Sequence, residues 1–527
     1  DKVNQGHLVD WLPASVMQQY KFPDLVSALL SVHRPDKDAD VRRLNQCQSK
    51  PQQRLLFEEL LAHQLSLLQA RQIIRKNRAA KIVLDKKVHR DFVDQLPFQL
   101  TAAQESVIAE ILADIDSEQP MLRLVQGDVG SGKTVVAAMA ALAVVGHGLQ
   151  VAIMAPTEIL AEQHYNNFCQ WMGADNCLLL TGKDKGKNRE YKLEQIAGGD
   201  CLVIIGTHAL FQEAVVFKDL ALLVVDEQHR FGVHQRLALR EKGVNAEGDR
   251  DGGSVPHQLI MTATPIPRSL AMTAYADLDY SVIDELPAGR KPVKTVVVST
   301  ARRQEVIQRI EKACEQGEQA YWVCTLVEES EFLQCQAAEV TAEQLTADLA
   351  RVRIALVHGR MKAAEKQAVI DDFKNKKIDL LVATTVIEVG VDVPNASLMV
   401  IENAERLGLA QLHQLRGRVG RGAKQSACVL MYQPPLSEQG KQRLAILRET
   451  NDGFKVAEKD LEIRGPGEVL GTRQTGLMQM RIADIVRDEH WFDEVRKTAM
   501  IILEKHPQAV RPLVRRWLGK ADRFVHV

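Results

Sequence analysis

The chain has 527 residues, of which 46% are hydrophobic and 26% charged, so it is long enough for several buried cores and too apolar to be disordered or collagen-like. Its 67 Lys and Arg residues are balanced by 68 Asp and Glu residues, for a formal net charge of -1. This balance excludes a uniformly basic surface, so local patches would have to bind any nucleic-acid partner. The scattered cysteines include no C-x-x-C pair, which favours reduced thiols in a cytosolic protein over a zinc site.

Two further features of the sequence concern membrane segments and the start of the chain. The longest apolar run, Val135 to Gly146, is too short to span a bilayer, so we interpret it as a buried helix and expect no membrane segment. The chain begins at Asp1 without an initiator Met or a signal-peptide pattern, which predicts a fragment or a processed chain.

Residues 1 to about 90 have apolar side chains at helical spacing, and they predict a helical leader. From Met121 the pattern changes to short aliphatic runs separated by longer amphipathic stretches. The runs that predict buried strands are Leu122 to Val125, Val151 to Met154, Leu202 to Ile205, Leu222 to Val225 and Leu259 to Met261. Short buried strands that alternate with helices predict a parallel α/β lobe over residues 91–288.

A second α/β lobe is predicted over residues 289–440. A Pro- and Gly-containing stretch at 285–292 predicts the hinge before it. Its strands are expected at Thr295 to Val298, Ala320 to Val323, Ile354 to Val357, Leu380 to Ala383 and Leu398 to Ile401. Beyond about residue 437 the alternation stops, and residues 441–527 are predicted to be helical with a Gly-rich interruption. The fold class is therefore α/β, with two parallel-sheet lobes, a helical leader and a helical C-terminal region.

The segment 127–134 matches the phosphate-loop pattern G-x-x-x-x-G-K-[ST] and lies between a predicted strand and an Ala-rich helix, as that pattern requires. Its glycines would let backbone N–H groups surround phosphates at a helix N-terminus. Lys133 can reach the β and γ phosphate oxygens, and Thr134 can ligate Mg²⁺. The nucleotide-binding candidates here are Gly127, Gly130, Ser131, Gly132, Lys133 and Thr134.

Two adjacent carboxylates, Asp226 and Glu227, follow the predicted strand that ends at Val225. The carboxyl ends of strands are where α/β folds bind ligands, so Asp226 is a candidate second anchor for Mg²⁺. Glu227 is then a candidate general base for the attacking water. An acidic strand-to-loop turn is the alternative, and the phosphate loop upstream makes it the weaker interpretation.

Cations that could balance charge on a transferred phosphoryl group lie in the second lobe, in the Gly-spaced segment 411–422. Arg418 and Arg421 are three residues apart, a spacing that projects both to one side of a helical segment. A solvated charged face is the ordinary alternative for such a run. Because the first lobe holds a phosphate loop, we predict that Arg418, Arg421 and Gln414 belong to a phosphoryl-transfer site.

These motifs, with Met261 to Pro267 and Thr384 to Pro394, resemble in order the motifs of superfamily 2 helicases and translocases. The resemblance implies two RecA-like lobes with ATP and Mg²⁺ in the cleft. It also implies that Gln104 reads the adenine, and that Phe98, Gly390 and Asp392 belong to the nucleotide site. The residues it assigns to the nucleic-acid track, or to its coupling with ATP, are Pro156, Thr157, Thr207, His208, Thr262, Thr264, Thr384 and Thr385.

A narrower resemblance covers Gly453 to Gly476, which is similar to the translocation motif shared by the RecG family and bacterial transcription-repair coupling translocases. The Arg464-Gly-Pro-Gly-Glu core and the segment from Asp226 to Arg236 favour the RecG family. By this resemblance Arg443, Arg464 and Gln474 couple lobe movement to duplex translocation, although a solvated helix charge is an alternative for Arg443. The leader resembles the segment after the wedge domain of that family, so by this resemblance we expect the sequence to lack the wedge itself.

The resemblance to the RecG family implies an ATP-driven motor on branched double-stranded DNA that remodels stalled replication forks and migrates Holliday junctions. It also implies a monomer in the bacterial cytoplasm, associated with the nucleoid and with single-stranded DNA-binding protein as a partner. The alternatives are an RNA helicase, a coupling translocase, and a P-loop regulatory ATPase that does not track nucleic acid. Stimulation of ATP hydrolysis by duplex or forked DNA, but not by RNA, would separate a DNA motor from an RNA helicase and from a regulatory ATPase.

Overall fold

A computed structural model describes the chain apart from residues 1–7, 76, 228–253, 265–266, 268–277, 288, 326–330, 386–392, 423, 465–479, 485–486 and 520–527. The chain divides into two compact units. One unit comprises residues 78–266 and 280–463 and holds both α/β lobes. The other comprises residues 1–77, 267–279 and 464–527, so it combines the two ends of the sequence.

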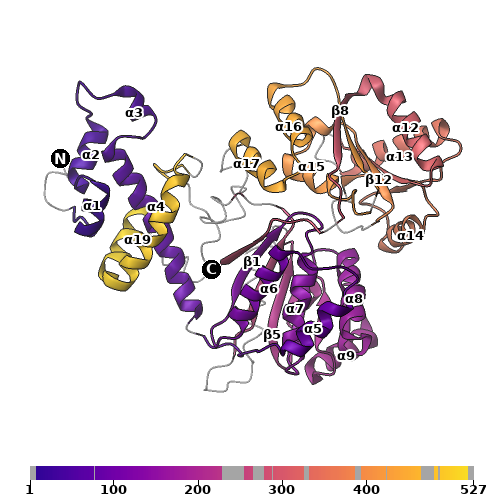
Figure 1. Ribbon diagram of the computed structural model, residues 1–527, viewed down its shortest axis with the longest axis horizontal. Coiled ribbons are helices and arrows are strands. Elements are labelled where there is room, and N and C mark those ends of the chain that lie inside the picture. The colour runs from indigo at the N-terminus through magenta and orange to yellow at the C-terminus, as the bar shows by residue number, and fades with distance from the viewer. Residues whose placement is uncertain are drawn as a thin grey trace. The chain divides into compact units, whose positions relative to one another are not determined.

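The first lobe is built on a seven-stranded sheet with the order β3-β4-β2-β5-β6-β1-β7. Figure 1 labels two of its strands, β1 and β5. Its strands are β1 (Leu122–Gly127), β2 (Gln150–Met154), β3 (Cys177–Leu180), β4 (Val203–Gly206), β5 (Leu220–Asp226), β6 (His257–Thr262) and β7 (Asp279–Ile283). All five predicted strands are present, and the pairings from β3 through to β1 are parallel. Val125 of β1 and Asp226 of β5 both pair with Met261 of β6, so the phosphate-loop strand and the acidic strand end at one edge of the sheet.

Helices cover both faces of this sheet. The helices on one face are α5 (Lys86–Gln95), α6 (Ala102–Ile115), α7 (Lys133–Val145) and α8 (Glu158–Met172), and α9 (Gly186–Gly198) packs on the other. The apolar run after the phosphate loop forms the buried helix α7, as predicted. Among the described residues, neither α7 nor any other helix is long and apolar enough to cross a membrane.

The second lobe has a six-stranded parallel sheet with the order β10-β11-β9-β12-β13-β8. Its strands are β8 (Lys294–Ser299), β9 (Gln319–Val323), β10 (Ile354–Val357), β11 (Leu380–Ala383), β12 (Ala396–Ile401) and β13 (Ala427–Tyr432). Two helices, α12 (Arg303–Glu315) and α13 (Glu331–Asp348), pack on one face. The other face is covered by α14 (Ala363–Lys374), α15 (Leu409–Arg416), α16 (Glu438–Glu449) and α17 (Gly453–Arg464).

The second unit is helical, and its long helix α4 (Lys50–Arg75) packs against helices from both ends of the chain (Figure 1). The helices from the leader are α1 (Ala14–Tyr20), α2 (Leu25–His33) and α3 (Val41–Asn45), and those from the C-terminal region are α19 (Phe492–Lys505) and α20 (Pro507–Leu518). Charged groups are buried where α4 meets the C-terminal helix α20. Glu58 of α4 is inaccessible to solvent and accepts hydrogen bonds from Arg54, Arg516 and Trp517.

Candidate nucleotide site

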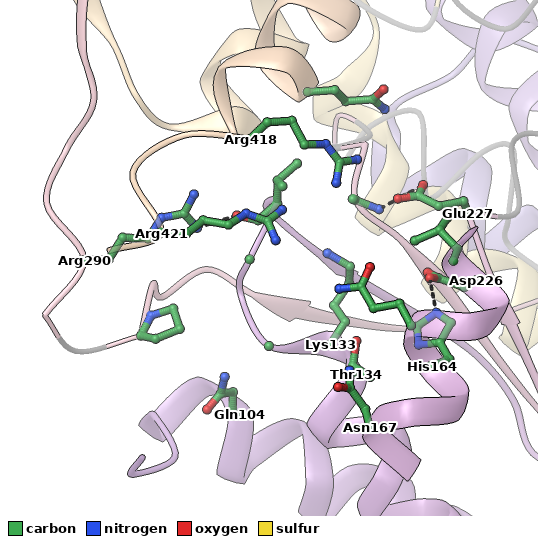
Figure 2. Close-up of a pocket in the computed structure, with 18 of the residues that line it drawn as sticks. Gln104, Lys133, Thr134, His164, Asn167, Asp226, Glu227, Arg290, Arg418 and Arg421 are labelled. Carbon is green, nitrogen blue, oxygen red and sulfur yellow. Dashed lines mark hydrogen bonds and ion pairs between the residues drawn. The ribbon is translucent and has the colours of Figure 1, made fainter. Parts of the chain in front are cut away.

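A pocket with a volume of about 670 Å³ lies at the carboxyl edge of the first sheet and is closed by residues of the second lobe (Figure 2). All six residues that the sequence analysis proposed as catalytic line this pocket: Lys133, Asp226, Glu227, Gln414, Arg418 and Arg421. The pocket is also lined by five of the predicted nucleotide-binding residues, namely Phe98, Gln104, Gly130, Gly132 and Thr134. The fold therefore joins motifs that lie far apart in the sequence.

The phosphate loop needs glycine at two positions for a conformational reason. Gly130 and Gly132 have positive φ angles of 76° and 84°, which a residue with a Cβ rarely adopts. A Cβ at Gly132 would also lie 2.2 Å from Nε2 of Gln104. The loop can therefore form its turn before α7 only with glycine at these two positions.

Gln104 connects the loop to the N-terminus of α6. Its Nε2 donates a 2.8 Å hydrogen bond to the carbonyl oxygen of Ser131, and its Oε1 accepts one of 2.8 Å from the backbone N–H of Thr101. The Thr101 side chain accepts in return from the Gln104 backbone, which completes a capping box. The predicted adenine reader is thus buried against the loop, while Phe98 on the pocket wall is exposed enough to stack with a base.

Lys133 lies folded against its own loop. Its Nζ donates hydrogen bonds of 2.8 Å and 3.0 Å to the carbonyl oxygens of Gly127 and Asp128. Burial lowers the pKa of Lys133, although the nearby carboxylates of Glu227, Asp226 and Asp128 act in the opposite direction. Phosphate oxygens are stronger acceptors than carbonyls, so this ammonium group can exchange its partners for those of a nucleotide.

The two carboxylates at the end of β5 have different environments. Burial would raise the pKa of Asp226, but the hydrogen bond and charge of His164 and the charge of Lys133 outweigh it and lower that pKa. The pKa of Glu227 is raised by burial and by the neighbouring Asp226. An ionised Asp226 suits a cation, and a more basic Glu227 suits the acceptance of a proton.

The arginine segment differs from its expected local structure. Helix α15 ends at Arg416, so Arg418 and Arg421 do not lie on a helix, and the prediction of a shared helical side was wrong. The chain turns at Gly420, where φ is 79°. Both arginines nevertheless line the pocket (Figure 2). Gln414 Nε2 donates a 2.6 Å hydrogen bond to Thr264 Oγ1 of the first lobe.

Further contacts between the lobes involve residues that sequence reasoning did not single out. His413 Nε2 lies 2.6 Å from Asp128 Oδ1 in the phosphate loop, and its Nδ1 lies 2.8 Å from Nη2 of Arg416. Arg290, from the predicted hinge, donates to the carbonyl oxygens of Val129 and Gly420. The sequence held a signal for each of these residues. Asp128 lies inside the phosphate-loop pattern, His413 lies inside the Gly-spaced arginine segment, and Arg290 is a cation in the predicted hinge.

The residues predicted to line the nucleic-acid track are at the ends of strands in both lobes. Pro156 lines the nucleotide pocket, and Thr157 is the N-cap of α8, with its side chain accepting from Leu160 N at 3.4 Å. Thr207 is buried and precedes η3 (His208–Phe211), whose first residue, His208, is exposed. The assignment of these residues to nucleic acid stays a prediction.

The other four predicted threonines, two for the track and two for its coupling to ATP, lie at or just after the ends of strands: Thr384, Thr385, Thr262 and Thr264. Thr262 Oγ1 accepts a 3.2 Å hydrogen bond from Thr264 N in the segment after β6. Thr384 is buried next to β11, and its N–H donates to Val357 O at 3.3 Å, with Thr385 following it. These hydrogen bonds fix the local backbone at the ends of β6 and β11.

Of the predicted translocation residues, Arg443 has a structural role that its sequence context did not reveal. Its guanidinium group donates to the carbonyl oxygens of Leu407 and Glu405 at 3.0 Å and 2.8 Å, so it is not a simply solvated charge. Arg464 is the last residue of α17. The remaining predicted residues, Gly390, Asp392 and Gln474, lie outside the described residues.

The donor set fits Mg²⁺ carried by a nucleotide. Thr134 and Asp226 offer the hydroxyl and carboxylate oxygens that Mg²⁺ prefers, at one pocket. In the described part of the chain, no group of three His, Cys, Asp or Glu side chains is placed to hold a metal. Mg²⁺ commonly uses only one or two protein ligands together with phosphate oxygens and water, so such a cluster is not required.

Two parallel-sheet lobes around a phosphate loop, an Asp-Glu pair at a strand end and two arginines from the opposite lobe define a class, the RecA-like ATPases of helicase superfamily 2. Family models agree with this class. Residues 101–273 match the DEAD/DEAH box helicase family, residues 301–423 match the helicase conserved C-terminal domain, and residues 450–517 match the C-terminal part of domain 3 of the ATP-dependent DNA helicase RecG.

Individual relatives narrow the class. The chain is 56% identical over 503 residues to the ATP-dependent DNA helicase RecG of Haemophilus influenzae, which covers 95% of this chain and 72% of that protein. The RecG helicase of Escherichia coli strain K12 gives the same identity and coverage. A solved structure of RecG bound to a three-way DNA junction matches with a TM-score of 0.70 and 39% identity, over 92% of this chain and 62% of that one. This chain belongs to the RecG family of ATP-dependent DNA helicases.

Proposed function

We propose that this chain uses ATP hydrolysis to translocate on branched double-stranded DNA, and that it remodels stalled replication forks and migrates Holliday junctions. The observation that supports this most directly is the pocket that combines the phosphate loop and Asp226-Glu227 of one lobe with Gln414, Arg418 and Arg421 of the other. The similarity to the solved structure of RecG bound to a three-way DNA junction supports the choice of branched DNA. A bacterial cytoplasmic location, a monomeric state and single-stranded DNA-binding protein as a partner belong to the same proposal.

In the proposed reaction, each lobe supplies part of the chemistry. The loop N–H groups and Lys133 would bind the β and γ phosphates, and Thr134 and Asp226 would hold Mg²⁺, which would neutralise phosphate charge when bound. Glu227 accepts a proton from the attacking water, for which its raised pKa is suited. Arg418 and Arg421 stabilise the charge that develops on the transferred group.

Hydrolysis would act on DNA through the contacts that join the lobes. Gln414 bonds Thr264, and His413 bonds Asp128, so a change in the phosphates can shift one lobe against the other. Thr157, Thr207, His208, Thr262, Thr384 and Thr385 would face the duplex or relay its position, and Arg443, Arg464 and Gln474 would transmit the movement. Such a motor grips phosphates more than bases, so its DNA affinity should fall with salt and show little sequence preference.

The deciding experiment compares ATP hydrolysis with three-way junction DNA, linear duplex and structured RNA at one salt concentration. We expect strong stimulation by the junction, some by the duplex and none by RNA, together with displacement of a third strand from a triplex. Lys133→Ala is the control that should remove hydrolysis under all conditions. Equal rates with RNA and DNA would reject the proposal in favour of an RNA helicase, and rates that no nucleic acid changes would favour a regulatory ATPase.

A further inference from the structure

His164 occupies a buried position in α8 and contacts the candidate metal anchor. Its Nε2 lies 2.9 Å from Asp226 Oδ2, and Figure 2 shows its ring directed at that carboxylate. His164 is 5% exposed and Asp226 is 9% exposed, so water competes little for this hydrogen bond. Among the described residues, His164 is the side chain that hydrogen-bonds to Asp226.

The direction of this hydrogen bond follows from the chemistry of the two groups. An ionised carboxylate only accepts, so Nε2 of His164 must carry the proton and donate it. Nδ1 of His164 is buried and has no hydrogen-bond partner among the described residues. The ring therefore makes one directed donation, toward Asp226 Oδ2.

A carboxylate that binds a metal needs a fixed orientation, and outer groups that hydrogen-bond to a ligand commonly provide it. Here one oxygen of Asp226 is taken by His164, and the same carboxylate lines the pocket beside Lys133 and Thr134. Free rotation about the Asp226 side chain would exchange its two oxygens and weaken a cation site. The bond from His164 opposes that rotation.

The backbone that carries His164 is itself well anchored. Helix α8 packs against β3, β4 and α7, and it begins directly after its N-cap Thr157. His164 follows Thr157 by seven residues, which is about two helical turns. The helix therefore joins a predicted DNA-contacting segment to the acidic end of β5 without a flexible connection.

We propose that His164 is a positioning residue of the ATP site, which holds Asp226 through Oδ2 so that the carboxylate presents its other oxygen to the Mg²⁺ that accompanies the nucleotide. This inference rests on the proposed function, in which Asp226 anchors that ion. It does not make His164 a catalytic residue, because the ring touches neither phosphate nor water in this role.

The test measures binding rather than turnover. A fluorescent, non-hydrolysable ATP analogue is titrated onto the whole chain at a series of Mg²⁺ concentrations, and the Mg²⁺ midpoint for tight binding is compared among variants. We expect His164→Ala to raise this midpoint by about 10–100-fold, the usual effect of losing an outer-shell partner, and to leave the weak binding without Mg²⁺ unchanged. His164→Gln keeps an N–H donor of similar reach, so it should recover much of the loss.

Two further variants separate the possible outcomes. Asp226→Asn should raise the midpoint at least as far as His164→Ala, and His257→Gln, at another buried histidine of the same lobe, should leave it unchanged. A wild-type midpoint in both His164 variants, with Asp226→Asn impaired, would show that His164 only packs. If Asp226→Asn also keeps the wild-type midpoint, then Asp226 is not the anchor and the proposed function loses its metal site. Circular dichroism checks that each variant folds. If His164→Ala does not fold, the Mg²⁺ midpoint of His164→Gln is compared with that of the wild type instead.

Discussion

Glu227 adopts a left-handed backbone conformation, with φ at 55°, directly after the buried strand β5. Such a conformation costs a residue other than glycine roughly 1–3 kcal/mol, and strain of this kind is concentrated at functional sites. The turn directs the carboxylate into the pocket, where the N–H of Ala263 donates to it at 3.4 Å. The strain and the raised pKa of Glu227 both support its proposed role as a base.

Replacement of Glu227 by glutamine should separate binding from hydrolysis. The amide has nearly the same shape but cannot accept the proton of water, so we expect near-normal ATP affinity and hydrolysis slowed by about 10²–10⁴-fold. Single-turnover hydrolysis and equilibrium binding of an ATP analogue measure the two quantities. A large loss of affinity with little change in the hydrolytic step would instead assign Glu227 to binding.

His257 provides a test of pH dependence away from the pocket. Its Nε2 donates to Ala80 O at 2.8 Å, and its Nδ1 accepts from Met121 N at 3.0 Å, so the fully buried ring is bound as the neutral form. Burial lowers the pKa of His257 below the ordinary histidine value of about 6.5, although the bond to Ala80 acts in the opposite direction. Below that pH the unfolded chain binds a proton that the folded chain excludes.

The free energy of unfolding of the lobe should therefore fall as the pH drops below about 6.5, by up to roughly 1.4 kcal/mol per pH unit until the folded-state pKa is reached. Urea unfolding between pH 5 and 7.5 measures this slope. His257→Gln should be less stable at pH 7 and should lose part of the slope, because glutamine does not titrate. An identical slope in the variant would mean that other groups account for it.

At the scale of elements, the turn after α15 brings lobe 2 to the phosphate loop. A Cβ at Gly417 would lie 2.7 Å from Cβ of Val129, so glycine is needed for this approach. Arg421 Nε donates to Gly417 O at 3.3 Å, which orients its side chain along the turn. Arg416, by contrast, is buried in lobe 2 and donates to the carbonyl oxygens of Leu447 and Thr450, both at 2.8 Å.

Because Arg418 and Arg421 line the pocket and Arg416 is buried in lobe 2, their replacement should have different effects. Arg418→Ala and Arg421→Ala should reduce turnover by up to about 10³–10⁵-fold with a much smaller change in ATP affinity, because they act on charge that develops in the transition state. Arg416→Ala should instead destabilise lobe 2, because it removes a buried donor from two carbonyls. Rates, affinities and thermal unfolding of the three variants provide the comparison. Equal losses of affinity and turnover at Arg418 and Arg421 would contradict their assignment.

For the whole molecule, the leader and the C-terminal helices form one unit. Arg54 and Glu58 of α4 are inaccessible to solvent, and Glu58 also accepts from Arg516 Nη1 at 2.6 Å and from Trp517 Nε1 at 3.2 Å in α20. Arg54 also bonds Asp10 at 2.7 Å. Buried charges need such partners, because an unpaired ion in the interior costs several kcal/mol.

Glu58→Ala should destabilise this unit by about 3–5 kcal/mol, because it leaves the Arg54 guanidinium buried with less compensation. Hydrogen-deuterium exchange should become faster in α4 and α20 together, while nucleotide binding in the other unit stays unchanged. Glu58→Gln keeps acceptor capacity and should lose less. Faster exchange in α20 alone would indicate that the two ends of the chain fold independently.

The sequence by itself determined the features that depend on local patterns. Buried strands appear as short aliphatic runs, the phosphate loop as a spacing of Gly, Lys and Thr, and the acidic strand end as Asp226-Glu227. The sequence analysis did not predict strands β3, β7 and β13. It also did not place Arg418 and Arg421 in a turn. Packing, not periodicity, determines the conformation of these segments. The superfamily and the RecG family could thus be predicted, since their motifs are contiguous.

Only the tertiary structure decided which distant groups meet. His164 and Asp226 are 62 residues apart, Asp128 and His413 are 285 apart, and Glu58 and Arg516 are 458 apart. In each pair at least one group is unremarkable in its own segment, and the significance of the pair comes from burial, which makes a charge or a polar atom costly until a partner is supplied. The identity of that partner depends on strand order and helix packing, which no local pattern encodes.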